Sequence, residues 1–411
     1  MTSRSQAEAL DAADRLAGFR DRFALDDGDR LYVDGNSLGR LPLVARERVA
    51  ALVDEWGEEL VTAWPRWIEL PERVGDLLGR ACLGAAGGTV LVADSTTVNL
   101  FKLAAAALAA RGGGVLVTDD AEFPTDRYVL QGLGEVRLLQ SNPVAGPTAA
   151  DVAAACAPGD VALVCLSLVS YRSGARADLA EITGSAHEEG ALVLWDLSHA
   201  AGAVAIGLDA AGVDLAVGCT YKYLNGGPGS PAYLYVRREL QPELRSPIQG
   251  WFGQREQFAM GLDYDPEPGI GRFAAGTPSI LGIAALQAGV ELVAEAGAAA
   301  IETKAAALTE LAIELADERL GPLGFVVGTP RAAAARGAHV SLRHEEAWQV
   351  CQALIARANV VPDFRGPDSV RLGLPPLYTR FVDVWDAVDR IERIVSAGEH
   401  RDFPVARSRV T

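Results

Sequence analysis

One lysine stands where its amine could act as a nucleophile. Lys222 follows a largely apolar run, 213–217, and precedes a loop rich in Gly and Pro, 224–229, a change typical of a strand end. Its neighbours Tyr221 and Tyr223 would partly desolvate the amine and favour the neutral form that makes a Schiff base. A lysine beside a Gly-rich turn can also be an ordinary solvated residue, so the upstream segments decide between the two interpretations.

A second group of side chains could bind an anion. Ser95, Thr96 and Thr97 follow the short apolar run 90–92 and open a helical stretch. Hydroxyl and backbone N–H groups would therefore converge at the positive end of a helix dipole. The alternative is a plain helix cap, in which Ser95 serves only its own helix. The segment alone favours the cap, and its context shifts the balance towards an anion cradle.

A carboxylate could complete this site. Asp196 follows the apolar run 191–195 and precedes Lys222 by one strand–crossover–strand unit. At a neighbouring strand end it could face the lysine and keep the ring nitrogen of pyridoxal 5′-phosphate (PLP) protonated, which makes that ring an electron sink. His199 could stack on the ring or hydrogen-bond to it. Both residues could instead be structural, Asp196 as the cap of a turn.

The middle of the chain alternates strands with helices. This order predicts an α/β fold with a largely parallel sheet. Ligands bind at the C-terminal ends of such strands, where the polar residues named above collect. The expected strands are 90–92, 115–117, 136–139, 161–168, 192–195, 215–217 and 232–236, with helices at 96–111 and 177–189.

The two ends of the chain are expected to be mainly helical. An amphipathic helix is predicted at 5–24, and others at 43–56 and 70–83. The last third is predicted to be a smaller α+β unit that begins with an Ala-rich helix, 283–319, and continues with strands 325–327, 339–342 and 370–374 and helices 345–357 and 380–397. The predicted domains are an N-terminal arm that contributes to the small domain (1–60), a large cofactor-binding domain (61–282) and a small C-terminal domain (283–411).

Composition limits the classes of function. The 411 residues carry a formal net charge of -17, which argues against a nucleic-acid surface of clustered Lys and Arg. No apolar run approaches the ~20 residues of a membrane span, and the N-terminal segment lacks the apolar core of a secretory signal. Five cysteines without a CxxC pair suggest neither a disulfide framework nor a zinc site. We therefore expect a cytoplasmic protein that acts on a small molecule, without metal, nucleic acid or membrane.

An anion cradle, a strand-end aspartate and a strand-end lysine, in this order, are the parts of a fold-type I PLP enzyme. Through most of its length the sequence resembles the kynureninases, which are class V aminotransferase-like enzymes. The resemblance implies a large domain with a mainly parallel seven-stranded sheet flanked by helices, and a smaller α+β C-terminal domain. It rests on the segments DGNSLG (34–39), DSTTVNL (94–100), FPTD (123–126), WDLSHA (195–200), GCTYKYLNGGPG (218–229), GWFG (250–253) and RLGLPPLY (371–378).

The resemblance implies hydrolysis of L-kynurenine to anthranilate and L-alanine in tryptophan breakdown, with 3-hydroxy-L-kynurenine as a further substrate. Lys222 would bind PLP covalently and remove the substrate α-proton, Asp196 would pair with the pyridine nitrogen, and Tyr221 would relay a proton. The remaining cofactor contacts implied are Phe123 on the ring, Thr96, Thr97, Tyr221 and Trp251 at the phosphate, Asp126 and His199 at the ring and its hydroxyl, and Thr277 from the partner subunit of a homodimer with shared sites.

The resemblance also implies residues that bind the substrate. Arg371 would clamp the α-carboxylate with its bidentate guanidinium fork, and Asn36 is assigned to the substrate as well. Trp64 and Gly276 would border the aryl pocket. From the residues alone, a surface ion pair for Arg371 and a core or interface position for Trp64 are the simpler interpretations.

One departure from the family pattern leaves the substrate open. Gln254 stands where family members usually carry His, and an amide cannot carry a proton charge near neutrality. A specialised 3-hydroxykynureninase or substituted-kynurenine hydrolase of a biosynthetic pathway is therefore the main alternative. A cysteine desulfurase would need an exposed, activated thiol downstream of the lysine, and Cys351 falls in a helical pattern instead. An inactive PLP-binding homologue is the remaining alternative.

Overall fold

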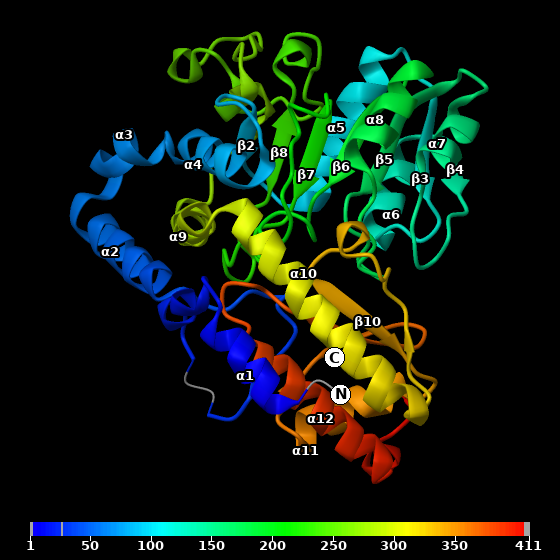
Figure 1. Cartoon of the computed structure of the whole chain (residues 1–411). Coiled ribbons are helices and arrows are strands. Elements are labelled where there is room, and N and C mark those ends of the chain that lie inside the picture. Colours follow the sequence, from blue (N-terminus) through cyan, green and yellow to red (C-terminus); the bar gives the residue numbers. More distant parts are fainter. Residues whose placement is uncertain (1–2, 26–27, 407–411) are drawn as a thin grey trace.

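A seven-stranded β-sheet is the largest sheet of the computed structural model, which describes residues 3–25 and 28–406 (Figure 1). The order is β2-β8-β7-β6-β5-β3-β4, and β8 runs antiparallel to both of its neighbours while the pairs from β7 to β4 are parallel. The predicted α/β fold with a mainly parallel sheet is confirmed. The strands are β2 Val90–Val92, β3 Val115–Asp119, β4 Val136–Leu139, β5 Val161–Ser167, β6 Leu192–Asp196, β7 Leu215–Gly218 and β8 Tyr233–Val236.

Helices cover both faces of this sheet because its strands bury side chains on both sides. In β6, Val193 and Trp195 enter one apolar cluster, whereas Leu192 and Leu194 enter another on the opposite face. The second face packs against α5 (Thr96–Ala110) and α6 (Pro124–Leu133), and the first against α7 (Ala149–Cys156) and α8 (Leu179–Glu188).

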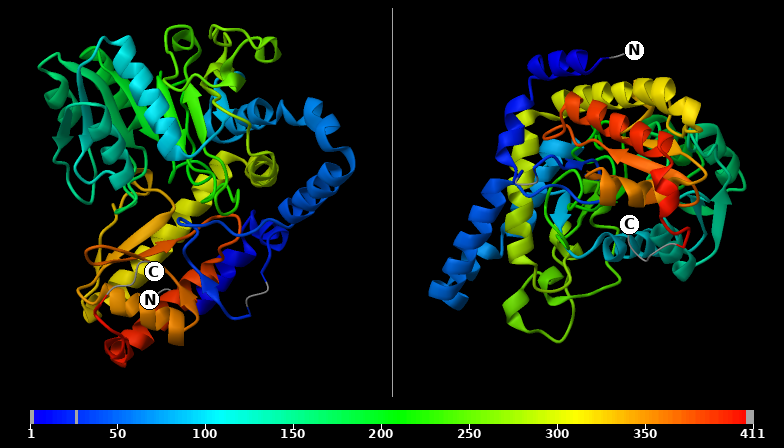
Figure 2. Two further views of the ribbon diagram at one scale, coloured as in Figure 1. Left: turned by 180° about the vertical axis from the view of Figure 1, so that it is seen from behind. Right: turned by 90° about the horizontal axis from the view of Figure 1, so that it is seen from below.

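A four-stranded antiparallel sheet forms the centre of the C-terminal third, with its own apolar cluster. The N-terminal segment joins this part, since α1 (Arg4–Ala12) packs on α12 and β1 (Leu31–Tyr32) pairs with β11 (Val360–Val361) (Figure 2). The predicted domain boundaries themselves stay a prediction. The other elements here are β9 Val326–Val327, β10 His339–Arg343, β12 Asp363–Arg365, β13 Ser369–Gly373, α10 Ala298–Leu315, α11 Ala347–Arg357 and α12 Phe381–Ser396.

Two predicted helices are interrupted, so both predictions were wrong in extent. The helix expected over 5–24 ends at Ala12, because the Asp14 carboxylate accepts the N–H of Leu16, two residues ahead, at 2.8 Å and pairs with Lys304. A separate 3-10 turn follows at Ala17–Arg22. The helix expected over 283–319 is two helices, α9 (Ile280–Ala296) and α10, because Gly297 adopts a φ of 80° between them.

The described residues contain no single helix with the length and apolar character of a membrane span. Only α9 and the helical stretch after it, taken together, meet that test by length and composition, and they are bent by 85°.

Two further helices, α2 (Leu43–Glu59) and α3 (Trp64–Trp67), extend away from the large sheet (Figure 1).

The packing of α9 supports the loop that carries Lys222. A Cβ at Gly289 of α9 would lie 1.9 Å from the carbonyl oxygen of Leu224. We expect Gly289→Ala to lower the free energy of unfolding by about 1–3 kcal/mol in urea denaturation, because the loop must shift. The control is Gly184→Ala in α8, where a Cβ meets nothing within 4 Å and alanine should stabilise by up to about 1 kcal/mol. Equal losses in both variants would contradict this packing.

Candidate active site

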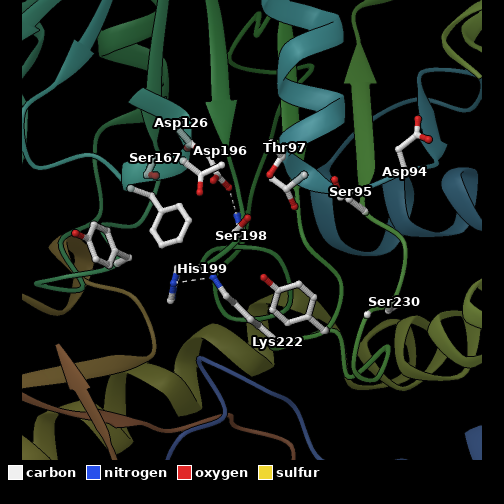
Figure 3. Close-up of a pocket in the computed structure, with 17 residues that line it drawn as sticks. Asp94, Ser95, Thr97, Asp126, Ser167, Asp196, Ser198, His199, Lys222 and Ser230 are labelled. Carbon is white, nitrogen blue, oxygen red and sulfur yellow. Dashed lines mark hydrogen bonds between the residues drawn. The ribbon is translucent and has the colours of Figure 1, made fainter. Parts of the chain in front are cut away.

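One cavity collects polar side chains from the C-terminal ends of the strands (Figure 3). Its volume of about 380 Å³ lies in the range of small-molecule sites. The prediction that polar residues gather at this edge of the sheet is confirmed, while the role of each one stays a prediction. Of the residues assigned from the sequence, those lining the cavity are Thr96, Thr97, Phe123, Asp126, Asp196, His199, Tyr221 and Lys222.

Lys222 differs from the other two lysines of the sequence. Lys102 and Lys304 are buried, and each amine pairs at 2.6 Å with a carboxylate, of Asp94 and Asp14 respectively. Within the described part of the chain, only the Lys222 amine has no carboxylate partner; it lies in the cavity, 2.9 Å from His199 Nε2 and 6.0 Å from the centre of the Tyr221 ring. A contact with His199 therefore holds the Lys222 amine in place, but no carboxylate of the described residues pairs with it.

The backbone around Lys222 is fixed by close contacts. The Gly39 N–H donates to the Tyr221 carbonyl at 2.7 Å, and the Asn225 N–H donates to the Lys222 carbonyl at 3.0 Å. A Cβ at Gly39 would lie 2.2 Å from that same Lys222 carbonyl oxygen, so only glycine allows the segment 37–40 to approach so closely. The DGNSLG segment (34–39) thus packs against the backbone of Tyr221 and Lys222 and helps to fix it.

Two acidic side chains, Asp126 and Asp196, line the cavity and form its acidic wall, and buried Glu122 lies close enough for its charge to act on Asp126. Asp196 accepts a hydrogen bond from the Ser198 N–H at 2.6 Å. Burial, followed by the charges of Asp196 and Glu122, raises the pKa of Asp126, and burial raises the pKa of Glu122 to about 7. Asp126 Oδ2 has no hydrogen-bond partner among the described residues. A ligand with a protonated ring nitrogen would find acceptors here.

The histidine beside the lysine is held neutral. Burial, and then the positive charge of Lys222, lower the pKa of His199 well below its usual value. Its ring lies 5.3 Å from that of His339, a buried residue that sequence reasoning missed. A neutral imidazole can accept a hydrogen bond from the lysine amine, which orients the amine towards the cavity.

We expect acid to destabilise the protein relative to a His339→Gln variant. Burial, and then Arg371 and Lys222, lower the pKa of His339, whereas the unfolded chain takes up this proton near its ordinary pKa of about 6.5. Below that pH the unfolded state binds more protons, so the stability contributed by neutral His339 falls as pH falls, by about 1.4 kcal/mol per pH unit. Urea unfolding of both proteins between pH 7 and 5 measures this difference. A difference that does not change with pH would contradict it.

The anion cradle, at the first turn of α5, lines the same cavity as the acidic wall. Ser95 caps α5 by accepting the Val98 N–H at 3.4 Å, as the cap interpretation requires. Thr96 and Thr97 occupy the first turn and line the cavity, so the dipole of a 15-residue helix points at the space between them and Lys222. The cap is therefore confirmed, and it is compatible with the anion cradle, which stays a prediction.

The chemistry of the cavity wall fits PLP. Among the described residues, an amine without a carboxylate partner, an acidic wall with an unpartnered oxygen and a helix N-terminus surround one space. These groups match the aldehyde, the ring nitrogen and the phosphate of that cofactor. Phe123, whose ring lies 5.3 Å from that of Tyr171, adds an aromatic face on the same wall.

Arg371 and Asn36 lie outside the cavity lining. The Arg371 guanidinium is buried, donates from Nε to Asp363 Oδ2 at 2.8 Å and bonds the carbonyl of Tyr171, which lines the cavity. Asn36 is fully buried against Gly373, where a Cβ would lie 1.7 Å from Asn36 Oδ1. The sequence analysis missed Asp363. A signal was present: the Gly366-Pro367 pair predicts a turn, and the hairpin around it pairs Asp363 with Arg371 between β12 and β13.

Four assigned residues, Trp64, Trp251, Gly276 and Thr277, do not line the cavity that holds Lys222. Gly276 and Thr277 line an adjoining cavity of about 210 Å³ that shares Asp94 and Gly229 with the first. Trp251 is 43% exposed, and Trp64 packs 6.5 Å from Phe252, ring to ring. The chain does not bring these four to its own Lys222.

Gln254 and the five cysteines all have structural contacts that explain their positions: a hydrogen bond for Gln254 and burial for the cysteines. Gln254 Oε1 accepts the Asp265 N–H at 2.7 Å and thereby closes the loop between these residues. All five cysteines are buried free thiols, and burial raises the pKa of Cys351 well above its usual value. The exposed, activated thiol that a desulfurase requires is therefore not supplied by any of them.

Comparison with solved structures defines the class of fold. A cysteine desulfurase from Thermococcus onnurineus NA1 matches with a TM-score of 0.78 at 20% identity, covering 92% of this chain and 98% of that one. A cysteine desulfurase from Escherichia coli matches with a TM-score of 0.77 at 19% identity, covering 93% and 99%. At such identities the likeness shows the fold alone, which is that of the fold-type I PLP-dependent enzymes.

Sequence comparison then identifies the family. The kynureninase of Pseudomonas fluorescens is 43% identical over 410 residues, covering 96% of both chains, and that of Burkholderia pseudomallei is 42% identical with the same coverage. Residues 301–391 match the model of the kynureninase C-terminal domain. The chain belongs to the kynureninase family.

Proposed function

We propose that this protein is a PLP-dependent hydrolase that converts L-kynurenine and water to anthranilate and L-alanine. The observation that carries the proposal is the position of Lys222, the one lysine amine without a carboxylate partner among the described residues, in a cavity that also holds an acidic wall and an anion cradle. Membership of the kynureninase family supplies the substrate.

The residues of the cavity would divide the work of binding PLP. When bound, its protonated ring supplies an electron sink for the substrate α-carbon. Asp196 would keep the ring nitrogen protonated, and the dipole of α5 would favour the phosphate dianion. The other contacts proposed are Thr96, Thr97, Tyr221 and Trp251 at the phosphate, Phe123 on the ring face, Asp126 and His199 at the ring and its hydroxyl, and Thr277 from the partner subunit.

Two side chains beside the substrate would move protons. Lys222 Nζ would remove the proton from the substrate α-carbon, and neutral His199 at 2.9 Å would hold the amine in place. The neighbouring Cys219, and then burial, raise the pKa of Tyr221, so its phenol keeps its proton at neutral pH. Tyr221 would then give this proton to Cβ of the alanine fragment when its bond to the γ-carbon breaks.

Arg371 would bind the α-carboxylate of the substrate. Its guanidinium is already fixed by Asp363 and by the Tyr171 carbonyl, so little side-chain entropy would be lost on binding. Asn36, Trp64 and Gly276 are proposed to complete the substrate site, the last two at the aryl group.

We infer a cytoplasmic homodimer with shared active sites that binds neither nucleic acid nor a membrane. Trp251 and Thr277 do not line the main cavity of their own chain, which is compatible with a role in a partner's site. Exposed apolar side chains cluster in the neighbouring loop, at Phe258, Met260 and Leu262, which favours contact with another copy. Buried free thiols are consistent with a reducing compartment.

Product analysis with two substrates tests the proposed function. The purified protein, supplied with PLP, is incubated separately with L-kynurenine and 3-hydroxy-L-kynurenine, and kcat/KM is measured for each. Anthranilate and alanine in equal amounts from L-kynurenine would support the proposal. A preference of a hundredfold or more for the hydroxylated substrate would favour a specialised 3-hydroxykynureninase. PLP binding without an aryl product from either substrate would indicate an inactive homologue.

A further inference from the structure

Lys102 is a buried lysine on α5, the helix whose first turn forms the anion cradle, and it has no assigned part in catalysis. Lys102 on α5 is 0% exposed, and its amine donates two hydrogen bonds of 2.6 Å, to Asp94 Oδ2 and to the Phe273 carbonyl. These partners come from two other segments, the loop after β2 and the 3-10 turn Ile270–Phe273. One ammonium group therefore joins three parts of the chain.

Asp94 links this lysine to the cradle. It directly precedes the helix cap Ser95, adopts a φ of 49° and lines the main cavity beside Thr96 and Thr97. Asp94 lines the cavity at the first turn of α5, so a charge on its carboxylate would act on an anion bound there. An unneutralised carboxylate at this point would repel a phosphate dianion.

The second partner belongs to the segment that forms the adjoining cavity. Phe273 immediately precedes residues 274–279, which line that cavity and include Gly276 and Thr277. Asp94 lines both cavities. The Lys102 ammonium thus fixes the spacing between the cradle and the segment 274–279.

A charge at this depth is costly for the fold. Burial lowers the pKa of Lys102, and Asp94 opposes that effect. Replacement of both members of such a pair by uncharged residues of similar size often leaves the free energy of unfolding unchanged or raises it. Stability therefore gives no reason for this pair, whereas the proximity of Asp94 to an anion site does.

We propose that Lys102 is a positioning residue that cancels the charge of Asp94 beside the cradle and so maintains affinity for the phosphate group of PLP. The proposal rests on PLP being the cofactor of this cavity. Lys102 does not touch the cofactor; it acts through Asp94 and through the Phe273 carbonyl.

The test measures PLP binding to the apoprotein in phosphate-free buffer, with pyridoxal, which lacks the phosphate, as the matched probe. We expect Lys102→Met to weaken PLP at least tenfold and pyridoxal less than threefold, because only the phosphate senses the Asp94 charge. The double variant Lys102→Met with Asp94→Asn should regain most of the PLP affinity. Equal weakening of both probes, or no recovery in the double variant, would overturn the proposal.

Two further variants keep the test decisive if Lys102→Met does not fold. Asp94→Asn alone should bind PLP as tightly as the unmodified protein or more tightly, and weaker PLP binding with unchanged pyridoxal binding would refute the role of charge. Lys102→Arg, which keeps the charge, should retain PLP affinity within about threefold, and a loss as large as that of Lys102→Met would also refute it. Failure of the unmodified protein to bind PLP would instead remove the proposed function.

Discussion

Replacement of Lys222 by alanine is expected to lower kcat for L-kynurenine by about 10³-fold or more, with PLP still bound. The substitution removes the amine that lies 2.9 Å from His199 in the cavity, and with it the group proposed to remove the α-proton. Neither of the other lysines can replace it, since both are buried in ion pairs. The measurement is anthranilate formation at saturating substrate.

A cofactor-binding control separates chemistry from folding in this variant. The acidic wall and the cradle are untouched by Lys222→Ala, so the variant should bind PLP non-covalently and keep the circular dichroism of the unmodified protein. Retention of even a tenth of the original kcat would show that another group removes the proton.

The second large effect is expected for Asp196→Asn, which changes the charge at the end of β6 and almost nothing in shape. Loss of a buried ionic partner costs about 3–5 kcal/mol, and the same loss in the transition state corresponds to a fall in kcat of about 10²–10⁴-fold. We expect kcat to fall because the ring nitrogen of PLP would no longer stay protonated without the Asp196 carboxylate. Steady-state kinetics with L-kynurenine at several pH values measures it.

Asp120→Asn is the matched control for this change, because Asp120 is exposed near the end of β3 and does not line the cavity. It should leave kcat within about twofold of the original value. If Asp196→Asn were as active as Asp120→Asn, the acidic wall would have no part in catalysis.

The core of the site could be predicted from the sequence because parallel strands bring their C-terminal ends to one edge. The positions of Asp196 and Lys222 follow from that rule once the strands are recognised, and Ser95 signals the helix that faces them. The helix interruptions could not be predicted in the same way: Gly297 lies within an Ala-rich run, and the turn at Asp14 depends on its distant partner Lys304.

Residues whose placement depends on tertiary contacts escaped the sequence-based prediction. Arg371 looks like an exposed guanidinium in the sequence, but its pairing with Asp363 across the β12–β13 ladder buries it. Lys102 reads as an ordinary residue of α5, and only the folded chain brings Asp94 and Phe273 to it. That Trp251 and Thr277 serve the site of a second chain stays a prediction.

The fate of the solvent oxygen tests the central claim most directly. L-Kynurenine is incubated with the protein and PLP in water enriched in heavy oxygen, and the products are identified by mass spectrometry. Hydrolysis at the γ-carbonyl predicts alanine and anthranilate in equal amounts, with one heavy oxygen in the anthranilate carboxylate, and neither product with Lys222→Ala. Release of an α-keto acid that retains the whole carbon skeleton, as transamination would give, or the absence of anthranilate, would contradict the account.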